Sequence, residues 1–356
     1  MEVKTLGELC NIVSGGTPSR SKAEFWNDGT IPWIKIGNIK GKYVSEADEY
    51  ITQAGLDGSS AKLLSKGTVL YTIFATLGEV GVLSIDACTN QAIAGLTIKD
   101  ENQLNTDYLY YYLKSKKSYV NNVGRGVAQN NINMSILRSF ELPLPELSQQ
   151  KQIVDVLDKV SAIIETRQQE LQKLDDLIKA RFVELFGHPD TNEKEWKMNT
   201  FGDICTVRQG LQIPISKRLT EYEDDCYEYI TVQYLHGGKA REYIKSPKST
   251  VICTKEDILM TRTGNTGLVI TGVDGVFHNN FFLIDFDRAK YDKDFLVQYL
   301  NLDAIQADIL RRAGTSTIPD LNHGEFYKIK VFEPPIELQR SFNGFVKQVD
   351  KSKFVV

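Results

Sequence analysis

Apolar residues recur in two similar series, one in each half of the chain. Residues 7–15 and residues 202–210 keep their apolar positions at an offset of 195, and each segment predicts a strand that ends at a glycine. Residues 33–39 and residues 229–235 alternate apolar and polar side chains, as half-buried strands do. The segments follow one another in the same order in both halves, which indicates a shared fold.

The similarity continues along each series. Residues 66–80 align with residues 255–269 at an offset of 189, and residues 107–113 and 294–300 share an amphipathic pattern that predicts the same helix. The chain is therefore expected to hold two copies of one domain. Such a duplication suits a protein that binds two similar sites, and duplication for stability alone would leave the same pattern.

A long helix is predicted between the two copies. Residues 148–186 contain no Pro or Gly, Ser148 is a suitable N-cap, and Gly187 is expected to end the helix. Apolar residues recur from Ile153 to Leu185 at alternating spacings of four and three, which is the heptad pattern of a coiled coil. Since this segment would span roughly 58 Å as a helix, it is predicted to be a spacer that needs a partner helix.

The end of the second copy begins the same helix. Phe342, Val346 and Val349 repeat the start of the seam at the offset of 189, but Lys353 stands where an apolar residue is expected. We expect a shortened helix of about two turns, so that an antiparallel pair of full length cannot form within the chain. Arg167 and Arg181 interrupt the first seam, and they either pair with carboxylates of a partner or extend to solvent.

Composition bounds the remaining choices. A chain of 356 residues with 42% hydrophobic and 25% charged residues is typical of a globular protein with two domains. Neither a signal peptide nor an apolar run of 18 residues is present, so a soluble cytoplasmic protein without membrane contact is expected. Five cysteines without a Cys-x-x-Cys pair predict buried free thiols and no structural metal.

No motif for catalysis is found in the sequence. Phosphate-binding loops, dinucleotide-binding glycines, zinc-protease helices, nucleophile elbows and an amino-methyltransferase motif are all missing, and the four histidines are scattered. The net charge of −4 argues against strong nucleic-acid binding unless basic residues cluster. A non-enzymatic protein is predicted.

Three motifs, in this order, carry a resemblance. They are Ser-Gly-Gly-Thr-Pro-Ser at residues 14–19, Pro-Glu-Leu-Ser-Gln-Gln-Lys-Gln-Ile-Val at residues 145–154, and Phe-Val-Glu-Leu-Phe-Gly at residues 182–187. Over its whole length the chain resembles the specificity (S) subunit of type I restriction-modification systems. The resemblance implies an α+β chain with two tandem α/β target recognition domains, each a mixed β-sheet with helices, separated by a coiled-coil helix. The expected parts are recognition domains at 1–145 and 191–335, a spacer helix at 146–190 and a truncated distal helix at 336–356.

The resemblance also implies a function and partners. Each recognition domain would read one half of a bipartite, asymmetric sequence in double-stranded DNA, while the helices set the spacing and dock methyltransferase (M) subunits and, through them, the restriction (R) subunit. The chain itself would bind no cofactor, because S-adenosylmethionine and ATP are expected only on the partner subunits. A homodimer through the helices is a further partner that this reading allows. The shortened distal helix puts normal docking in doubt and leaves an inactive variant as an alternative.

Two other classes of function are weighed against this one. A self-contained restriction or methylation enzyme is opposed by the missing cofactor and nucleophile motifs. A tandem module that binds another polymer, such as a glycan, would not explain the heptad helix.

Polar loop residues are the candidates for DNA contact, because DNA offers phosphates to cations and base edges to bidentate or amide groups. Neither recognition domain is strongly basic, so much of the phosphate clamp is expected from partner subunits. The predicted DNA-binding residues are Thr17, Ser19, Arg20, Lys22, Asn38, Lys40, Arg125, Gln129 and Asn130 in the first copy and Gln212, Lys217, Arg218, Gln233, Arg262, Thr263, Asn265, Arg311, Arg312, Thr315 and Ser316 in the second.

Arg262 is the strongest of these candidates. The matching segment of the first copy, residues 73–76, is apolar where the second copy is polar, which suggests that the two copies read different bases. The amides at residues 90–91 and 279–280 fit either backbone capping or adenine contact, and the tyrosines of residues 108–112 are expected to serve core and helix packing rather than base stacking. The predicted partner-docking residues on the spacer helix are Leu157, Ile164, Leu171, Leu174 and Ile178.

Overall fold

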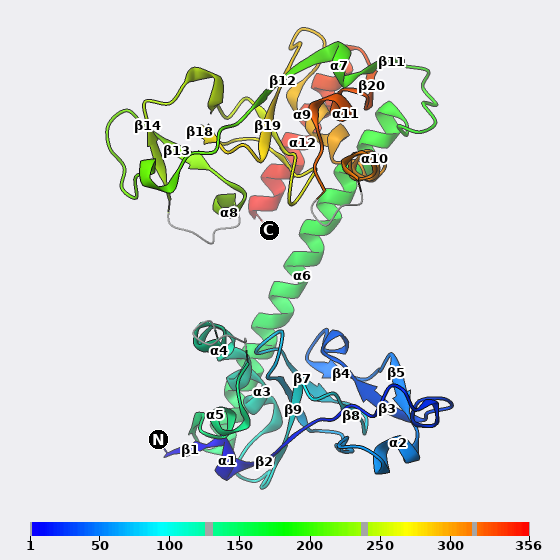
Figure 1. Cartoon of the computed structure of the whole chain (residues 1–356), viewed down its shortest axis with the longest axis vertical. Helices are drawn as coiled ribbons and strands as arrows, with labels where there is room; N and C mark the ends of the chain where they lie inside the picture. The colour runs from blue at the N-terminus through cyan, green and yellow to red at the C-terminus, as the bar shows by residue number, and fades with distance from the viewer. Residues whose placement is uncertain (1, 125–130, 236–240, 315–318, 356) are drawn as a thin grey trace. The chain divides into compact units, whose positions relative to one another are not determined.

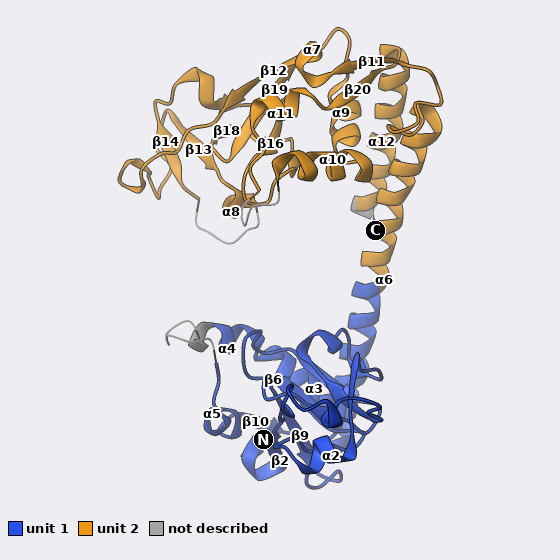
Figure 2. Ribbon diagram, turned by 45° about the vertical axis from the view of Figure 1, so that its right-hand side comes forward, with its two compact units in different colours: residues 1–165 blue, residues 166–356 orange. Residues whose placement is uncertain are grey.

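The computed structural model describes residues 2–124, 131–235, 241–314 and 319–355 of the chain. The chain divides into two compact units, residues 1–165 (unit 1) and residues 166–356 (unit 2) (Figures 1 and 2). The boundary falls within the long helix α6 (Leu147–Phe186), so each unit consists of one α/β domain and one part of this helix.

Unit 1 is built on mixed sheets. The larger sheet contains, in order, β2 (Cys10–Ser14), β9 (Ile93–Ile98), β6 (Val69–Thr72), β7 (Val80–Leu83) and β4 (Tyr43–Val44). The smaller sheet contains β5 (Glu49–Ile51), β3 (Ile31–Ile34) and β8 (Cys88–Thr89). Each sheet has one parallel pair, β4 with β7 and β3 with β8. The strand β1 (Glu2–Thr5) pairs antiparallel with β10 (Glu141–Leu144), so the start and the end of the domain are neighbours.

Helices cover the larger sheet of unit 1. The main one, α3 (Thr106–Ser115), is N-capped by Asn105, whose side chain accepts a hydrogen bond from the backbone of Tyr108. Leu109 and Leu113 of α3 share a core with the sheet residues Val69 and Leu96. The other helices are α1 (Leu6–Leu9), α2 (Gln53–Asp57), α4 (Lys117–Gly124) and α5 (Met134–Arg138), with 3₁₀ turns at Ala23–Phe25 and Ile36–Asn38.

Unit 2 repeats this plan (Figure 1). Its sheets contain β12 (Cys205–Gln209), β19 (Phe281–Phe286), β16 (Ile258–Thr261) and β17 (Val269–Ile270), and β14 (Tyr243–Lys245), β13 (Cys226–Ile230), β18 (Gly275–Phe277) and β15 (Ile252–Cys253). The strands β11 (Lys197–Thr200) and β20 (Lys330–Glu333) form the closing pair. Its helices are α7 (Phe201–Ile204), α8 (Val232–Leu235), α9 (Lys293–Leu300), α10 (Asp303–Ala313), α11 (His323–Tyr327) and α12 (Ile336–Val355), with 3₁₀ turns at Ile215–Lys217 and Ser249–Val251.

The predicted repeat is confirmed by strand pairing. The order β2-β9-β6-β7 in unit 1 corresponds to β12-β19-β16-β17 in unit 2. The registers agree as well, because Ile12 lies opposite Leu96 and Val207 lies opposite Ile284. The predicted helices of residues 107–113 and 294–300 are present as α3 and α9.

Two predicted strands are shorter than expected. Residues 33–39 were expected as one strand, but β3 ends at Ile34 and a 3₁₀ turn follows, because the side chain of Asn38 accepts a hydrogen bond from the backbone N–H of Lys35 at 2.8 Å. Residues 229–235 form the end of β13 and then α8, where Thr231 Oγ1 accepts from the backbone N–H of Tyr234 at 3.1 Å. In both places a side-chain cap favours a helical turn over the alternating pattern.

The long helix has its predicted end, and the second helix is longer than predicted. α6 has 40 residues and is followed by Gly187 at a φ of +79°, a left-handed conformation that suits glycine. α12 has 20 residues, so the expectation of about two turns was wrong. Its last turns are stabilised by Lys353, which forms ion pairs with Asp175 of α6 at 2.7 Å and with Asp350 at 2.8 Å.

α12 lies antiparallel to the second half of α6 within unit 2. Phe342, near the start of α12, contacts Phe182 and Phe186 at ring distances of 5.4 and 5.6 Å, whereas Lys353, near its end, reaches Asp175. A half-length antiparallel pair therefore forms inside the chain.

Two further findings concern the described residues. None of their helices is both long enough and apolar enough to cross a membrane. The cysteines are free thiols, of which Cys10, Cys88, Cys205 and Cys253 are buried and Cys226 is half-buried.

Candidate nucleic-acid interface

The loop after β2 holds a guanidinium between aromatic rings. Arg20 lies over the Trp26 ring at 3.7 Å and forms an ion pair with Glu49 at 2.6 Å. Lys35 reaches the same carboxylate at 2.7 Å, and these two cations lower the pKa of Glu49. Arg20 therefore orders the loop, while about half of its side chain stays exposed to solvent.

The other candidates of unit 1 differ in how they are held. Thr17 donates a hydrogen bond to the side chain of Gln91, and Asn38 caps the turn after β3. Ser19, Lys22 and Lys40 are exposed. The last three are thus the residues of this set that face solvent most freely.

Arg218 of unit 2 is fixed from several sides. Its guanidinium donates two hydrogen bonds to the carbonyl oxygen of Ile213, at 2.9 and 2.7 Å, and forms an ion pair with Glu242 at 3.0 Å. The ring of Tyr229 lies 5.0 Å from it, and only 15% of the side chain is exposed. These contacts assign Arg218 a role in holding the loop of residues 211–218.

Arg262 is oriented by a carboxylate. Its Nε and one terminal nitrogen donate to the two oxygens of Asp320 at 3.0 and 2.8 Å, a bidentate geometry, and 19% of its side chain is exposed. The equivalent of Arg262 in unit 1 is the buried Ile73, and both residues make the same backbone contact, Ile73 with Ile132 and Arg262 with Leu321. One backbone framework therefore carries an apolar side chain in one copy and a charged one in the other.

The end of α10 is also rich in ion pairs. Arg312 contacts Asp308 at 2.8 Å and Glu325 at 3.3 Å, and Arg311 pairs with Asp308 as well. Although burial opposes the charge of Asp308, the two arginines lower its pKa.

The remaining candidates fall into two groups. The exposed group consists of Gln212, Lys217, Gln233 and Asn265. Thr263 is half-buried and forms an isolated β-bridge with Asp320. Arg125, Gln129, Asn130, Thr315 and Ser316 lie outside the described residues.

Residues 90–91 and 108–112 have structural roles in unit 1. The side chain of Asn90 accepts a hydrogen bond from the backbone N–H of Ala92 at 3.2 Å, which corresponds to the capping alternative. Tyr108 and Tyr112 donate to the carbonyl oxygens of Pro143 and Glu141 at 2.8 and 2.7 Å. Tyr110 is buried in the core of unit 1 and the other tyrosines of this run pack against that core, as expected of packing residues.

The predicted docking residues of α6 do not share one environment. Ile164 and Leu171 are 52% and 37% exposed, and Leu157 is half-buried. Ile178 is buried in the core of unit 2, and Leu174 packs against that core. The seam arginines pair along their own helix, Arg167 with Glu170 and Arg181 with Glu184. Of the five predicted residues, two are already engaged inside unit 2.

Two buried glutamines have a role that the sequence did not predict, although one of them, Gln150, belongs to the motif of residues 145–154. Gln150 accepts a hydrogen bond from the backbone N–H of Asn105 at 2.9 Å, and its amide group donates to the carbonyl oxygens of Gln103 and Pro145 at 2.9 and 2.8 Å. Gln339 makes the same three bonds in unit 2, at 2.9, 2.9 and 2.8 Å. Each glutamine joins the start of a long helix to its domain. Their shared offset of 189 was the signal that could have revealed them.

The network around Lys42 adds a second link between α6 and the domain in unit 1. Its ammonium group contacts Asp158 of α6 at 2.7 Å and Asp107 of α3 at 3.2 Å, while the Tyr111 hydroxyl also donates to Asp158. Burial opposes the charge of Lys42, but the two carboxylates outweigh it and raise its pKa.

A family model for the type I restriction modification DNA specificity domain matches residues 1–175 and again residues 193–354. The chain belongs to this family. The two matches correspond to the two copies found in the sequence and in the strand pairing. Specificity subunits recognise DNA and do not carry out the chemistry of their systems, so this chain is a recognition subunit and not an enzyme.

Among the described residues, no group of three His, Cys, Asp or Glu side chains is placed to hold a metal ion.

Relatives and solved structures agree with this assignment. The chain is 28% identical to the MjaIX specificity subunit of Methanocaldococcus jannaschii over 97% of its own length and 86% of that protein. It is 30% identical to the EcoR124I/EcoR124II specificity subunit of Escherichia coli over 50% of its own length and 48% of that protein. The crystal structure of the S subunit from M. genitalium matches 99% of this chain and 90% of that one at 16% identity with a TM-score of 0.51, which supports the fold.

Proposed function

We propose that this chain reads a bipartite, asymmetric duplex sequence for a type I restriction-modification complex in the cytoplasm. Each recognition domain contacts one half of the target, and α6 and α12 set the spacing and dock M subunits, through which the R subunit joins. S-adenosylmethionine and ATP are bound by those partners.

The observation that carries this proposal is that the two domains share equivalent backbone contacts but have different side chains at these positions. Ile73 and Arg262 occupy equivalent backbone positions. So do Phe74 and Thr263, which form isolated β-bridges with Asn131 and Asp320, respectively. The backbone that the two copies share places equivalent residues in the same way, while different side chains at these positions offer different hydrogen-bond patterns to base edges. Two domains of this kind suit a target whose halves differ.

The contacts divide the candidate residues by role. Lys40 and Lys217 are exposed cations suited to phosphate, and Gln212 and Gln233 are exposed amides suited to base edges. Arg262 is the base-reading candidate in this proposal, because Asp320 holds two of its nitrogens and leaves the other terminal nitrogen free of that pair. A preoriented guanidinium loses less conformational freedom when it binds a guanine edge.

The test compares Arg262→Ala with Lys217→Ala in the complex with M subunits. Arg262→Ala is expected to relax preference at one position of one half-site by about 1–3 kcal/mol and to leave the other half unchanged. Lys217→Ala is expected to weaken all sequences alike and to reduce the salt slope of binding by about one. Binding to a library of duplexes at several salt concentrations measures both effects.

Two results would contradict the proposal. Equal loss of preference at both half-sites after Arg262→Ala would remove its role in reading one half. Methyl transfer to DNA by this chain alone with S-adenosylmethionine would show that it is an enzyme.

A further inference from the structure

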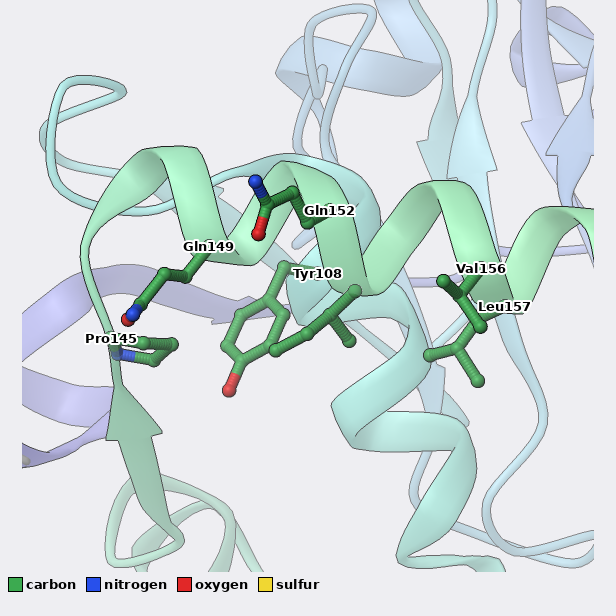
Figure 3. A pocket seen from close by; sticks show the side chains of 7 residues that line it. Tyr108, Pro145, Gln149, Gln152, Val156 and Leu157 are labelled. Atoms are coloured by element: carbon green, nitrogen blue, oxygen red, sulfur yellow. The ribbon is translucent and has the colours of Figure 1, made fainter.

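Large apolar side chains are exposed on α6 and also on one loop of unit 2. On α6, Val156 is 60% exposed and lies beside Leu157 at a hollow that Tyr108 also lines (Figure 3). This hollow belongs to the helix that the proposed function already uses for docking. Ile215, by contrast, is 78% exposed and lies on the loop of residues 211–218, away from any long helix in the sequence. Its exposure therefore needs another explanation.

The loop of residues 211–218 begins in the same way as its counterpart in unit 1. The carbonyl oxygen of Leu211 accepts a hydrogen bond from the hydroxyl group of Tyr229 at 2.9 Å. In unit 1 the carbonyl oxygen of Gly16 accepts one from the indole N–H of Trp33, also at 2.9 Å. Trp33 and Tyr229 correspond in the repeat, so the two loops start from equivalent anchors.

An arginine closes each of the two loops. The guanidinium of Arg218 lies 5.0 Å from the ring of Tyr229, and that of Arg20 lies 5.0 Å from the ring of Trp33. Each guanidinium also forms an ion pair with a glutamate. The end of the loop is thus fixed by the same kind of contact in both copies.

The two loops differ in length between these anchors. Arg20 is four residues after Gly16, whereas Arg218 is seven residues after Leu211, so the loop of unit 2 is longer by three residues. The segment Thr-Pro-Ser of unit 1 is replaced by Gln-Ile-Pro-Ile-Ser-Lys in unit 2. Ile215 lies within this longer segment, and the framework around it is the one that both domains share.

Ile215 is held on an ordered turn. The carbonyl oxygen of Ile213 accepts two hydrogen bonds from Arg218, at 2.9 and 2.7 Å. The backbone N–H of Lys217 donates to the carbonyl oxygen of Pro214 at 2.9 Å, within the 3₁₀ turn that begins at Ile215. A side chain on a turn that is fixed in this way loses little conformational freedom on binding.

The turn starts next to the strand end that carries Arg262. The carbonyl oxygen of Phe277 accepts a hydrogen bond from the backbone N–H of Leu211 at 3.1 Å. The carbonyl oxygen of Asn280, three residues later, accepts one from the backbone N–H of Arg262 at 2.7 Å. The loop with Ile215 and the base-reading candidate Arg262 are therefore anchored on the same short segment.

The neighbours of Ile215 suit DNA better than a protein partner. Gln212 and Lys217 are exposed on the same loop and offer an amide for a base edge and a cation for phosphate. The core of a protein–protein interface is instead a cluster of apolar and aromatic side chains. In the major groove the C5-methyl group of thymine is the apolar group that a base pair presents, and aliphatic side chains contact it.

We propose that Ile215 contacts the C5-methyl group of a thymine in the half-site that unit 2 reads. This inference rests on the proposed function and adds an apolar contact to the hydrogen bonds assigned to Arg262. The corresponding loop of unit 1 has no isoleucine, so the contact belongs to one half of the target.

The first experiment removes the methyl group from the DNA. The target of the complex with M subunits is found by binding to a library of duplexes, and each thymine is then replaced singly by uracil, which lacks only the C5-methyl group. One replacement is expected to weaken binding by about fourfold, the factor that corresponds to burial of one methyl group. Ile215→Ala is expected to weaken binding to the thymine target at least as much, and the same uracil should then have no further effect.

Two variants are the controls. Ile215→Val keeps a branched apolar side chain and should keep the effect of uracil at that position. Leu63→Ala changes an apolar residue of unit 1 that is 52% exposed, and it should leave the effect of uracil unchanged. Circular dichroism verifies that each variant is folded.

The second experiment places the contact in the protein. The thymine found in the first experiment is replaced by 5-iodouracil, whose iodine takes the place of the methyl group, and the complex is irradiated. Digestion with trypsin is expected to release the DNA bound to the peptide of residues 209–217, which lies between Arg208 and Arg218. Mass spectrometry identifies this peptide.

Four outcomes would overturn the proposal and leave the proposed function standing. The complex could select a target in which no uracil replacement depends on Ile215. Ile215→Ala could weaken binding to thymine and uracil targets by the same factor. It could weaken assembly with the M subunits while the effect of uracil persists, which would assign Ile215 to a protein contact. The iodouracil could cross-link to another segment. A complex that binds all duplexes alike would contradict the proposed function itself, and this contact with it.

Discussion

Histidine occurs only in the second half of this chain, at His188, His236, His278 and His323. Burial, followed by the nearby Arg218, lowers the pKa of His278 below its ordinary value of 6.5. Burial and Arg262 do the same for His323. Both side chains are therefore neutral in the folded protein under conditions in which the unfolded chain begins to bind protons.

This asymmetry predicts a pH dependence that is specific to unit 2. A lowered pKa contributes stability that is present above pH 6.5 and is lost as the pH falls through the folded value. Unit 2 should thus need less urea for unfolding at about pH 5.5 than at about pH 8, while unit 1, without histidine, should change little in this range. Hydrogen exchange read by mass spectrometry in urea at both pH values separates the two units.

The control for this prediction is the double variant His278→Gln and His323→Gln. It should show a flatter pH dependence in unit 2, because the titrating groups are gone. An unchanged slope in that variant would assign the effect to other residues. The carboxylate of Glu49, whose pKa is lowered by Lys35 and Arg20, acts only below its ordinary value of 4.5 and so falls outside this window.

At the scale of the elements, the buried glutamines fix where the long helices start. Gln150→Leu should destabilise unit 1 by about 2–4 kcal/mol, because the backbone groups of Asn105, Gln103 and Pro145 lose their partner in a buried place. The neighbouring Gln149 is exposed, so Gln149→Leu is the matched control and should cost little. Urea denaturation measures both variants, and equal losses would contradict the role of Gln150.

The elements also show what the sequence can predict. The repeat, α3, α9 and the end of α6 at Gly187 followed from apolar spacing and from one glycine, because these patterns depend on local geometry. The early end of β3 and the helix α8 did not follow, because side-chain caps at Asn38 and Thr231 decide them. The length of α12 was underestimated because Lys353 looked incompatible with a seam until Asp175 supplied its partner.

The candidate site was predicted less completely than the fold. Several of the predicted polar residues do lie in loops, but Gln233 lies in α8 and Arg311 and Arg312 lie in α10. The carboxylate partners of Arg20, Arg218 and Arg262 come from segments 24 to 58 residues away. Such pairs arise only once the chain has folded, so spacing could not separate the cations that hold loops from those that face solvent.

At the scale of the whole molecule, the second α/β domain depends on the helices α6 and α12, which precede and follow it in the chain. Phe182 and Phe186 of α6 and Phe342 and Val346 of α12 belong to the same core as the sheet of unit 2. The fragment 166–356 is therefore expected to unfold cooperatively, whereas the fragment 191–335 should lose more than the roughly 3–5 kcal/mol that one buried phenylalanine contributes and should fail to fold.

Thermal denaturation followed by circular dichroism compares the two fragments. The fragment 1–165, which retains Gln150 and its helix, serves as the reference for a domain with its own part of α6. Equal melting temperatures for 166–356 and 191–335 would show that the helices contribute nothing to the second domain.

The pairing of β1 with β10, and of β11 with β20, has an evolutionary consequence. In each copy the chain enters and leaves the domain on adjacent strands, with Glu2 opposite Leu144 and Lys197 opposite Glu333. The segment between these strands could be exchanged as one piece only if the residues that hold the helices were kept, such as Asn105, the backbone partner of Gln150, and Lys42, the partner of Asp158 in α6. If each domain reads one half of the target, as proposed above, genetic recombination at the strand pairs would change one half of the recognised sequence at a time.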